Sequence, residues 1–198
     1  MPALESQQPI SPGAFAPSPF IVGISGNISN PSRTRTLVET TVARAAQQAD
    51  GQSAVYDILD LQPALGTAYS AQDLSGSARE AFEAILAADA LVVASPVYKG
   101  SYLGLFKHLF DLVDPKQLVG KPVILGATGG SERHALVIEH QLRPLFSFFS
   151  TQIVPTGLYA TEKDFDGYAV GPVLSARIDL AAGQLVRLIA PHPSLQPA

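Results

Sequence analysis

Five short apolar segments recur along the chain, and longer stretches with helical spacing separate them. Strands that are apolar on both faces are typical of a parallel sheet covered by helices on both sides. The pattern therefore predicts an α/β fold with a doubly wound parallel sheet in the flavodoxin-like order 2-1-3-4-5, whose ligands bind beyond the carboxyl ends of the strands. The expected strands are 20–25 (FIVGIS), 53–59 (SAVYDIL), 90–95 (ALVVAS), 122–127 (PVILGA) and 151–159 (TQIVPTGLY).

Helices are expected between and after these strands, because apolar residues there recur three or four positions apart. The spacing places one apolar stripe on each helix, which would cover one face of the sheet. The apolar positions of the five expected helices begin at Leu37, Ala81, Leu105, Leu136 and Leu174.

The length of 198 residues fits one domain with a full hydrophobic core, which we expect to span 20–190. The segment 1–19 is rich in proline but has no basic start and no apolar centre. It is therefore predicted to be a flexible tail rather than a signal peptide. The closing segment, 191–198, is predicted to be a second flexible tail.

Composition and charge narrow the classes of function. The net charge is −4, with 13 basic and 17 acidic side chains, so no basic field favours nucleic acid. The chain has no cysteine, which excludes disulfides, thiolate nucleophiles and cysteine-ligated metals and fits a reducing compartment. No apolar run reaches the roughly 20 residues of a membrane span. We expect a soluble cytoplasmic protein with no nucleic-acid partner, no membrane partner and no metal.

The loop after the first strand, SGNISNPSRTRT (25–36), places cations where a helix begins. Ser32 is a natural N-cap, and the turn around it exposes backbone N–H groups and the positive end of the helix dipole. Most helices carry acidic residues there, whereas this one has Arg33 and Arg35. A phosphate would neutralise these charges, held by the N–H groups and by the hydroxyls of Ser32 and Thr34. The alternative is an ordinary capped helix with solvated arginines.

The loop after the third strand, SPVYKGSYLG (95–104), contains Pro96, which fixes φ and removes a hydrogen-bond donor. Such a loop either presents Val97 and Tyr98 to a flat ligand or is only a turn. Lys99 is either a second cation near the phosphate or a solvated surface charge.

The loop after the fourth strand, ATGGSE (127–132), lies at the same edge of a parallel sheet. Gly129 and Gly130 allow the backbone to approach a ligand closely, and Ser131 opens a helix. The N–H groups of this turn are placed to stabilise negative charge on an aromatic ring system. The alternative is a simple strand-to-helix turn.

In order, spacing and detail, these loops resemble the NAD(P)H-dependent FMN reductases of the flavodoxin-like superfamily. The likeness is greatest to the reductase components of two-component methanesulfonate and alkanesulfonate monooxygenases, and it runs from about Phe20 to the closing helix. It is carried by PSRT (31–34), ASPVYKGSYLGLFKHLFDL (94–112) and ATGGSERHALVIEHQLRPLFSFF (127–149).

The resemblance implies a site for each part of FMN. The residues that would bind its phosphate are Ser32, Arg33 and Thr34, and those that would shape the turn are Gly26 and Asn27. The ribityl chain and the flavin edge would be lined by Pro96, Val97, Tyr98 and Lys99. The pyrimidine side of the ring would contact Thr128, Gly129, Gly130 and Ser131. Many relatives have serine at the position of Asn27 and proline at the position of Ile28.

The helix after the fourth strand contains Pro144, which cannot donate to the carbonyl of His140, so this turn must bend or widen. The resemblance implies a π-type bulge at a tetramer interface, with His140 in the place of a tyrosine of alkanesulfonate reductases. Such a bulge often marks a functional site, whereas an ordinary proline kink with a core histidine is the alternative. Glu139 and Arg143 are expected to form an ion pair on the helix surface.

The resemblance also implies the reaction, which is hydride transfer from NAD(P)H to FMN and release of reduced FMN to a partner monooxygenase in sulfonate sulfur assimilation. We find no triad, metal cluster or paired carboxylates, and no catalytic side chain is predicted, because the cofactor carries the reactivity. A flavodoxin-type electron carrier and a quinone or azo reductase with tightly bound FMN are the alternatives.

Assembly is the last expectation. Members of this family resemble dimers of dimers, so the resemblance implies a homodimer or homotetramer. The apolar stretch PLFSFF (144–149) is more than one helix face needs, and either a partner subunit or the core would cover it.

Overall fold

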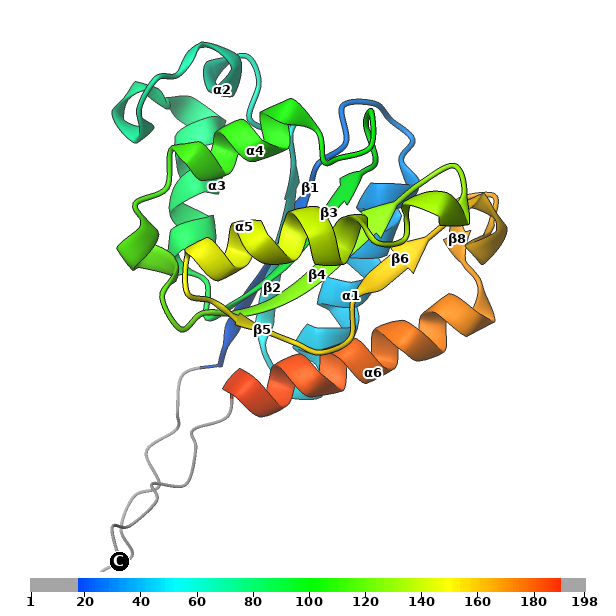
Figure 1. The fold of residues 1–198 in the computed structure, drawn as a ribbon. Coiled ribbons are helices and arrows are strands. Elements are labelled where there is room, and N and C mark those ends of the chain that lie inside the picture. The colour runs from blue at the N-terminus through cyan, green and yellow to red at the C-terminus, as the bar shows by residue number, and fades with distance from the viewer. Residues whose placement is uncertain (1–17, 190–198) are drawn as a thin grey trace, which may run out of the picture.

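A parallel sheet lies at the centre of residues 18–189, the part of the chain that the computed structural model describes (Figure 1). Its order is the predicted one, β2-β1-β3-β4-β5, and β6 also pairs with β4. The strands of this sheet are β1 (Phe20–Ser25), β2 (Gln52–Asp57), β3 (Ala90–Pro96), β4 (Pro122–Thr128), β5 (Gln152–Ile153) and β6 (Leu158–Ala160).

Helices cover both faces of the sheet, as Figure 1 shows. One face carries α3, α4 and α5, and the other carries α1 and α6. Because both faces are covered, β3 and β4 bury all their residues except the last one of each strand. The helices are α1 (Arg33–Ala49), α2 (Ala64–Thr67), α3 (Gly76–Ala87), α4 (Gly104–Asp111), α5 (Arg143–Phe148) and α6 (Pro172–Ile189).

Two hydrophobic layers hold this arrangement together. Between the sheet and α4 and α5, the rings of Phe106, Phe110 and Phe146 form a chain with centroids 5.0 Å and 4.8 Å apart. On the other face, α1 lies close to β1 because residue 23 is glycine. A Cβ at Gly23 would lie 2.5 Å from the Cγ1 atom of Val38, which no packed core tolerates.

The fifth expected strand, 151–159, is divided in the structure. Its two ends form β5 and β6, which pair in turn with the start and the end of β4. Pro155 lies between them and has no N–H to donate to a ladder, so the segment leaves the sheet and returns. Splitting this strand brings the residues after Ala160 to the carboxyl edge of the sheet.

The expected helix after β4 is also divided. A short 3₁₀-helix, Glu132–His134, comes first, and a π-helix, Ile138–Leu142, leads into α5. The N–H of Arg143 donates to the carbonyl of Ile138, five residues earlier, which widens the turn that precedes Pro144. The predicted π-type bulge is therefore confirmed.

The predicted tails, 1–19 and 191–198, lie outside the described residues except for Ser18 and Pro19. The carbonyl of Pro19 accepts a hydrogen bond from the N–H of Gln52 at 2.8 Å. Among the described helices, none combines the length and the hydropathy that crossing a membrane requires.

Candidate functional site: a depression at the carboxyl edge of the sheet

The loops after β1, β3 and β4 meet at the carboxyl edge of the sheet, and the segment after β6 joins them. Together they surround an open depression of about 310 Å³. The predicted residues that line it come from all three loops: Ser32, Arg33, Thr34, Pro96, Val97, Thr128, Gly129 and Gly130. The other lining residues are Ser29, Pro31, Thr161, Glu162, Phe165 and Tyr168.

The start of α1 faces this depression with its backbone donors. Ser32 has extended backbone angles, with φ of −138° and ψ of 122°, and its hydroxyl oxygen accepts from the N–H of Arg35 at 3.3 Å. Ser32 is therefore the N-cap, as predicted. The first turn of α1 contains no acidic residue, so the positive end of the helix dipole is not offset from within the helix.

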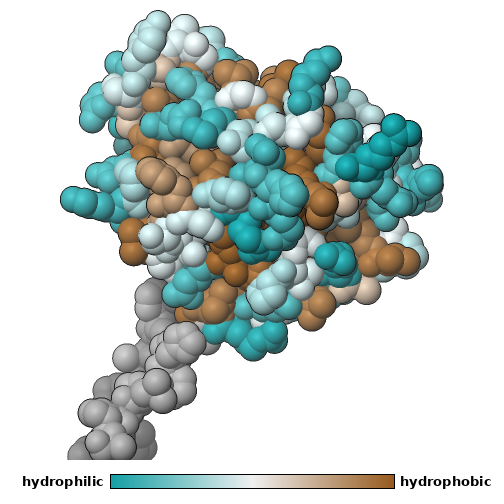
Figure 2. All heavy atoms as spheres, in the orientation of Figure 1, coloured by the Kyte–Doolittle hydropathy of each residue, from teal (hydrophilic) through white to brown (hydrophobic). Residues whose placement is uncertain are grey.

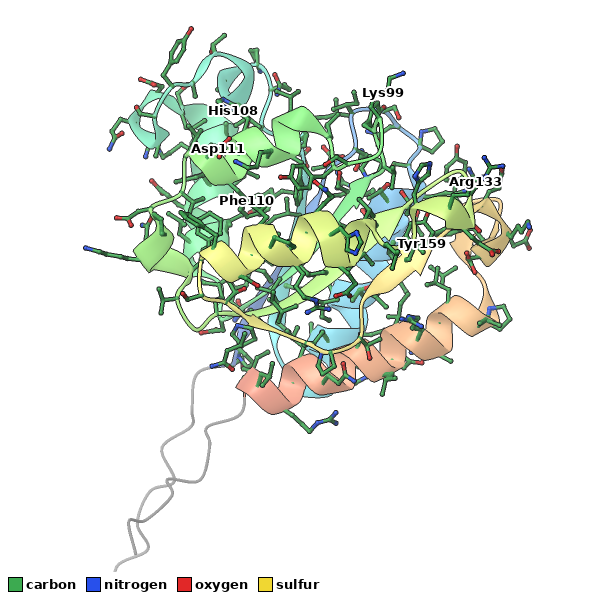
Figure 3. All side chains as sticks on the ribbon, viewed as in Figure 1. Lys99, His108, Phe110, Asp111, Arg133 and Tyr159 are labelled. Carbon is green, nitrogen blue, oxygen red and sulfur yellow. The ribbon has the colours of Figure 1, made fainter. Side chains whose placement is uncertain are left out.

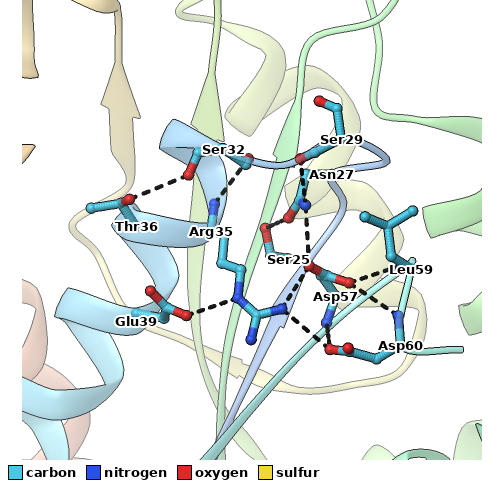
Figure 4. A network of polar contacts seen from close by, with 10 residues as sticks. All are labelled: Ser25, Asn27, Ser29, Ser32, Arg35, Thr36, Glu39, Asp57, Leu59 and Asp60. Carbon is cyan, nitrogen blue, oxygen red and sulfur yellow. Dashed lines mark hydrogen bonds and ion pairs between the residues drawn. The ribbon is translucent and has the colours of Figure 1, made fainter. Parts of the chain in front are cut away.

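Arg35 does not share this role, because its charge is already neutralised by three carboxylates, one on α1 itself and two at or just after the end of β2 (Figure 4). Its guanidinium lies 2.6 Å from Asp57, 2.7 Å from Glu39 and 3.3 Å from Asp60. The hydrogen bond to Glu39, followed by the contacts with Asp57, raises the pKa of Arg35 above its usual value despite partial burial. The expectation that both arginines await an anion is therefore wrong for Arg35.

Asn27 is a buried part of the same network rather than a lining residue of the depression (Figure 4). Its Oδ1 atom accepts from the hydroxyl of Ser25 at 2.5 Å. Its Nδ2 atom donates to the carbonyl of Ser29 at 3.1 Å and to Asp57 at 3.2 Å. The side chain thus fixes the loop between β1 and α1 from beneath.

Gly26 also shapes this loop from below. Its N–H donates to the carbonyl of Ala94 at 2.7 Å, which ties the loop to β3. A Cβ at residue 26 would lie 3.0 Å from the hydroxyl of Ser95 and 3.1 Å from the ring of Phe106. Glycine is needed here for this close approach.

Arg33 points across the depression to the segment after β6. Its Nη2 atom lies 2.6 Å from a carboxylate oxygen of Glu162, and its Nε atom donates to the carbonyl of Gly167 at 3.1 Å. The guanidinium also stacks 5.2 Å from the ring centroid of Tyr168. Arg33 is only partly exposed, whereas 76% of the Glu162 side chain is accessible to solvent.

Thr34 and Thr128 connect the first and third loops. Their hydroxyl oxygens are 2.6 Å apart, and either one can be the donor. Two hydroxyls carry two hydrogens and the bond between them uses one, so one hydrogen remains for another acceptor.

The glycine turn after β4 is packed against Tyr159. A Cβ at Gly129 would lie 2.1 Å from the phenolic oxygen of Tyr159, which itself donates to the carbonyl of Ser131 at 2.5 Å. Burial, and then the charge of Glu132, raise the pKa of Tyr159, which keeps the phenol protonated as a donor. The N–H of Gly129 is occupied, because it donates to the carbonyl of Ala160 at 3.0 Å.

Tyr98 and Lys99 lie on a tight turn that does not line the depression. The backbones of Tyr98 and Ser101 exchange two hydrogen bonds, and Lys99 adopts a positive φ of 49°. In Figure 3 the Lys99 side chain extends outward from the tip of this turn. Ser131 lines a neighbouring depression of about 370 Å³, which shares Gly130, Thr161 and Glu162 with the first.

Sequence reasoning missed the residues that the segment after β6 contributes. A 3₁₀-helix, Glu162–Asp164, is followed by a two-stranded hairpin of β7 (Phe165–Asp166) and β8 (Ala169–Val170). Gly167 and Tyr168 form the two-residue turn between these strands, and a glycine at the first turn position, here with a positive φ of 60°, is a hairpin signal. That signal was present in the sequence, but nothing in it indicated that the hairpin returns to this edge.

The comparisons with known proteins agree with this geometry. Residues 19–166 match the family described as NADPH-dependent FMN reductase. The chain belongs to that family. It is 47% identical over 173 residues to the NADH-dependent FMN reductase SfnF of Pseudomonas fluorescens, which covers 87% of this chain and 92% of that protein.

Two further proteins are similar to this FMN reductase over nearly its full length. It is 46% identical over 180 residues to the FMN reductase (NADPH) of Pseudomonas aeruginosa, with 90% of this chain and 97% of that protein covered. The solved structure of an oxidoreductase from Corynebacterium diphtheriae superposes with a TM-score of 0.75 at 37% identity, covering 88% of this chain and 98% of the other. The family resemblance and the flavodoxin-like fold are thus confirmed.

The donors of this reductase fit the phosphate of FMN. The N–H groups at the start of α1, the hydroxyl of Ser32 and the guanidinium of Arg33 converge on one depression. Hydroxyl, amide and guanidinium donors at a helix start are the chemistry that holds phosphate. Pro96 and Val97 add apolar surface to the same depression, which suits the ribityl chain and the flavin edge.

The π-helix of this reductase lies beside a third depression, of about 290 Å³, which His140 lines together with His134 and Arg133. His140 is exposed, which excludes the core histidine that we gave as an alternative. Arg143 forms the predicted surface ion pair with Glu139, with Nε 2.5 Å from a carboxylate oxygen. Among the described residues, no group of three or more histidines or carboxylates is placed to hold a metal ion.

Proposed function

We propose that this protein is an NAD(P)H:FMN oxidoreductase that releases reduced FMN to a flavin-dependent monooxygenase, in cytoplasmic sulfonate sulfur assimilation. One observation carries this proposal: the start of α1 and the glycine turn after β4 line one depression of about 310 Å³. The family and its relatives support it. The names of two similar relatives specify NADH for one and NADPH for the other, so we propose either nucleotide as the donor.

Each part of the site has a proposed role. Ser32, Arg33 and Thr34 would bind the phosphate of FMN, and the buried Gly26 and Asn27 keep the loop in shape. Pro96 and Val97 would line the ribityl chain, with Tyr98 and Lys99 on the adjoining turn beside the flavin edge. The pyrimidine side of the ring would contact Thr128, Gly129, Gly130 and Ser131.

The protein's contribution to the reaction is positioning. FMN supplies the hydride acceptor when it is bound, so the chain needs no acid, base or nucleophile of its own. Because Ala160 occupies the N–H of Gly129, we assign the stabilisation of negative charge to the N–H of Gly130 instead. The Thr34–Thr128 hydrogen bond joins the loop proposed to bind the phosphate to the loop proposed to contact the ring, and so would hold the two loops in register.

The purified protein is expected to oxidise NAD(P)H only when flavin is added, and to prefer FMN to riboflavin. Arg33→Ala should raise the KM for FMN by about 10- to 100-fold, because a hydrogen bond to a charged group contributes about 1.5–3 kcal/mol. The KM for riboflavin, which has no phosphate, should stay within about twofold of wild type. Steady-state rates followed at the nicotinamide absorbance band measure both.

The same assay separates the alternatives. A strongly yellow preparation that does not oxidise NAD(P)H would indicate an electron carrier. Turnover of quinone without turnover of free flavin would indicate a quinone reductase. Equal KM values for FMN and riboflavin in the wild-type protein would contradict the proposed phosphate site.

We further propose that the chain assembles into a homodimer or homotetramer through the face that carries α5 and the π-helix. In the stretch 144–149, the core buries Phe146 and Phe149, whereas Phe148 is 70% exposed. Leu136, which precedes the π-helix containing His140, is 61% exposed. Figure 2 shows hydrophobic residues at several places on this face, separated by hydrophilic ones.

Phe148→Ser is expected to shift the protein toward monomer without changing its fold. The control is Val173→Ser, which removes an apolar side chain that is 80% exposed at the start of α6. Light scattering after size exclusion gives the mass of each variant. A wild-type protein that is monomeric throughout the micromolar range, or a Phe148→Ser variant that assembles like wild type, would refute this interface.

A further inference from the structure

The proposed function assigns the guanidinium of Arg33 to the phosphate of FMN, but in the structure this guanidinium is already paired with Glu162. The two side chains meet at 2.6 Å, and both line the depression at the start of α1. Glu162 is not part of the capping of its 3₁₀-helix, because Thr161 and Asp164 form the capping box. The carboxylate of Glu162 is therefore held by Arg33 rather than required by its local fold.

Arg33 has no equivalent substitute at this helix start. Arg35, two residues later, is bound by Glu39, by Asp57 at the end of β2 and by Asp60 in the turn that follows. A phosphate arriving at the start of α1 must therefore compete with Glu162 for Arg33. The carbonyl of Gly167 and the ring of Tyr168 would continue to hold the guanidinium in place during that exchange.

We propose that Glu162 sets the affinity of this site for phosphorylated flavin, as an electrostatic competitor that keeps FMN exchangeable. This inference rests on the proposed function and names a specificity-determining residue for it. A reductase that hands reduced FMN to another enzyme needs a flavin site that empties between turnovers. A carboxylate beside the phosphate meets that need, because it repels a group of about two negative charges and rebinds Arg33 when the flavin leaves.

The solvent exposure of Arg33 and Glu162 determines how strongly Glu162 can weaken the binding of FMN. The Arg33 and Glu162 side chains are 32% and 76% exposed, so the pair is screened by water and is easily broken. Removing the charge of Glu162 should therefore lower the Kd for FMN by a moderate factor, about three- to tenfold. The Kd for riboflavin should not change, because riboflavin carries no phosphate to compete for Arg33.

The test compares Glu162→Gln with wild type by fluorescence titration of FMN and of riboflavin. Glutamine keeps the size of the side chain and removes its charge. The matched control is Glu132→Gln, which alters another exposed carboxylate that lines the neighbouring depression. We expect the FMN Kd to fall about three- to tenfold in Glu162→Gln only, with a slower release of FMN in stopped-flow dilution.

Three results would overturn the inference: an FMN Kd unchanged or raised in Glu162→Gln, an equal shift for riboflavin, or the same shift in Glu132→Gln. Wild-type binding keeps this failure separate from failure of the proposed function. If wild type prefers FMN to riboflavin and Glu162→Gln behaves like wild type, only the competitor role fails. If wild type binds both flavins equally, the phosphate site itself fails.

Discussion

Asp57→Ala is expected to lower the free energy of unfolding by about 2–4 kcal/mol, because it removes a buried carboxylate that accepts four hydrogen bonds. The Asp57 side chain is fully buried at the end of β2. It accepts hydrogen bonds from the guanidinium of Arg35 at 2.6 Å and from Asn27 at 3.2 Å. It also accepts from the backbone N–H groups of Leu59 at 2.9 Å and Asp60 at 3.1 Å.

These donors explain the size of the expected loss. Alanine would remove the side-chain acceptor of Arg35, of Asn27 and of the backbone N–H of Leu59, while the N–H of Asp60 keeps the carbonyl of residue 57 and Asn27 keeps the carbonyl of Ser29. Each unsatisfied buried group costs about 1–3 kcal/mol. The loop between β1 and α1 would also lose its anchor, so we expect weaker FMN binding by Asp57→Ala even at temperatures where the variant stays folded.

Chemical denaturation measures this loss, and Arg44→Ala is the control. That substitution breaks an ion pair between half-exposed side chains, Arg44 of α1 with Asp179 of α6, at 3.6 Å. We expect it to cost no more than about 1 kcal/mol. If the free energy of unfolding of Asp57→Ala lies within about 1 kcal/mol of the wild-type value, the network of Figure 4 does not stabilise the loop.

Gly129→Ala is expected to reduce kcat/KM for FMN by at least about tenfold, through displacement of Tyr159. The new Cβ would lie 2.1 Å from the phenolic oxygen and 3.1 Å from the Cζ atom of Tyr159, so the whole ring has to move. Moving it breaks the hydrogen bond to the carbonyl of Ser131 and shifts the turn that is proposed to contact the flavin.

A double-mutant cycle tests this cause. Tyr159→Phe removes the oxygen that a Cβ at residue 129 would meet, and by itself should cost only its hydrogen bond, about 1 kcal/mol. Gly129→Ala combined with Tyr159→Phe should therefore be more active than Gly129→Ala alone. If the double variant loses activity by the product of the two single effects, the clash with Tyr159 is not the reason for the loss.

The sheet could be predicted from the sequence because burial on both faces makes its strands continuously apolar. The segments at 20–25, 90–95 and 122–127 therefore appear where the sequence places them, within one residue. The fifth strand could not be predicted in the same detail. Its apolar residues do not show that the segment around Pro155 leaves the sheet, so that two short strands pair separately with β4. Local pattern identifies a strand, whereas its pairing depends on distant partners.

The same distinction between local pattern and distant partners applies to the residues of the site. Ser32 and the glycine turn could be predicted because a helix cap and a close backbone approach are local properties. The partners of the two arginines could not be predicted from the sequence. Arg35 is bound by Asp57, 22 positions away, and Arg33 by Glu162, 129 positions away, and only the fold brings these carboxylates to the helix. Charge near a helix start therefore predicted a site for an anion but not which arginine serves it.

A crystal structure of the FMN complex tests the central claim most directly. The account predicts the FMN phosphate at the start of α1, within hydrogen-bond distance of the Ser32 hydroxyl and the Arg33 guanidinium, with the flavin ring beside Gly130. A complex in which the phosphate lies elsewhere, with Arg33 still paired to Glu162, would contradict it.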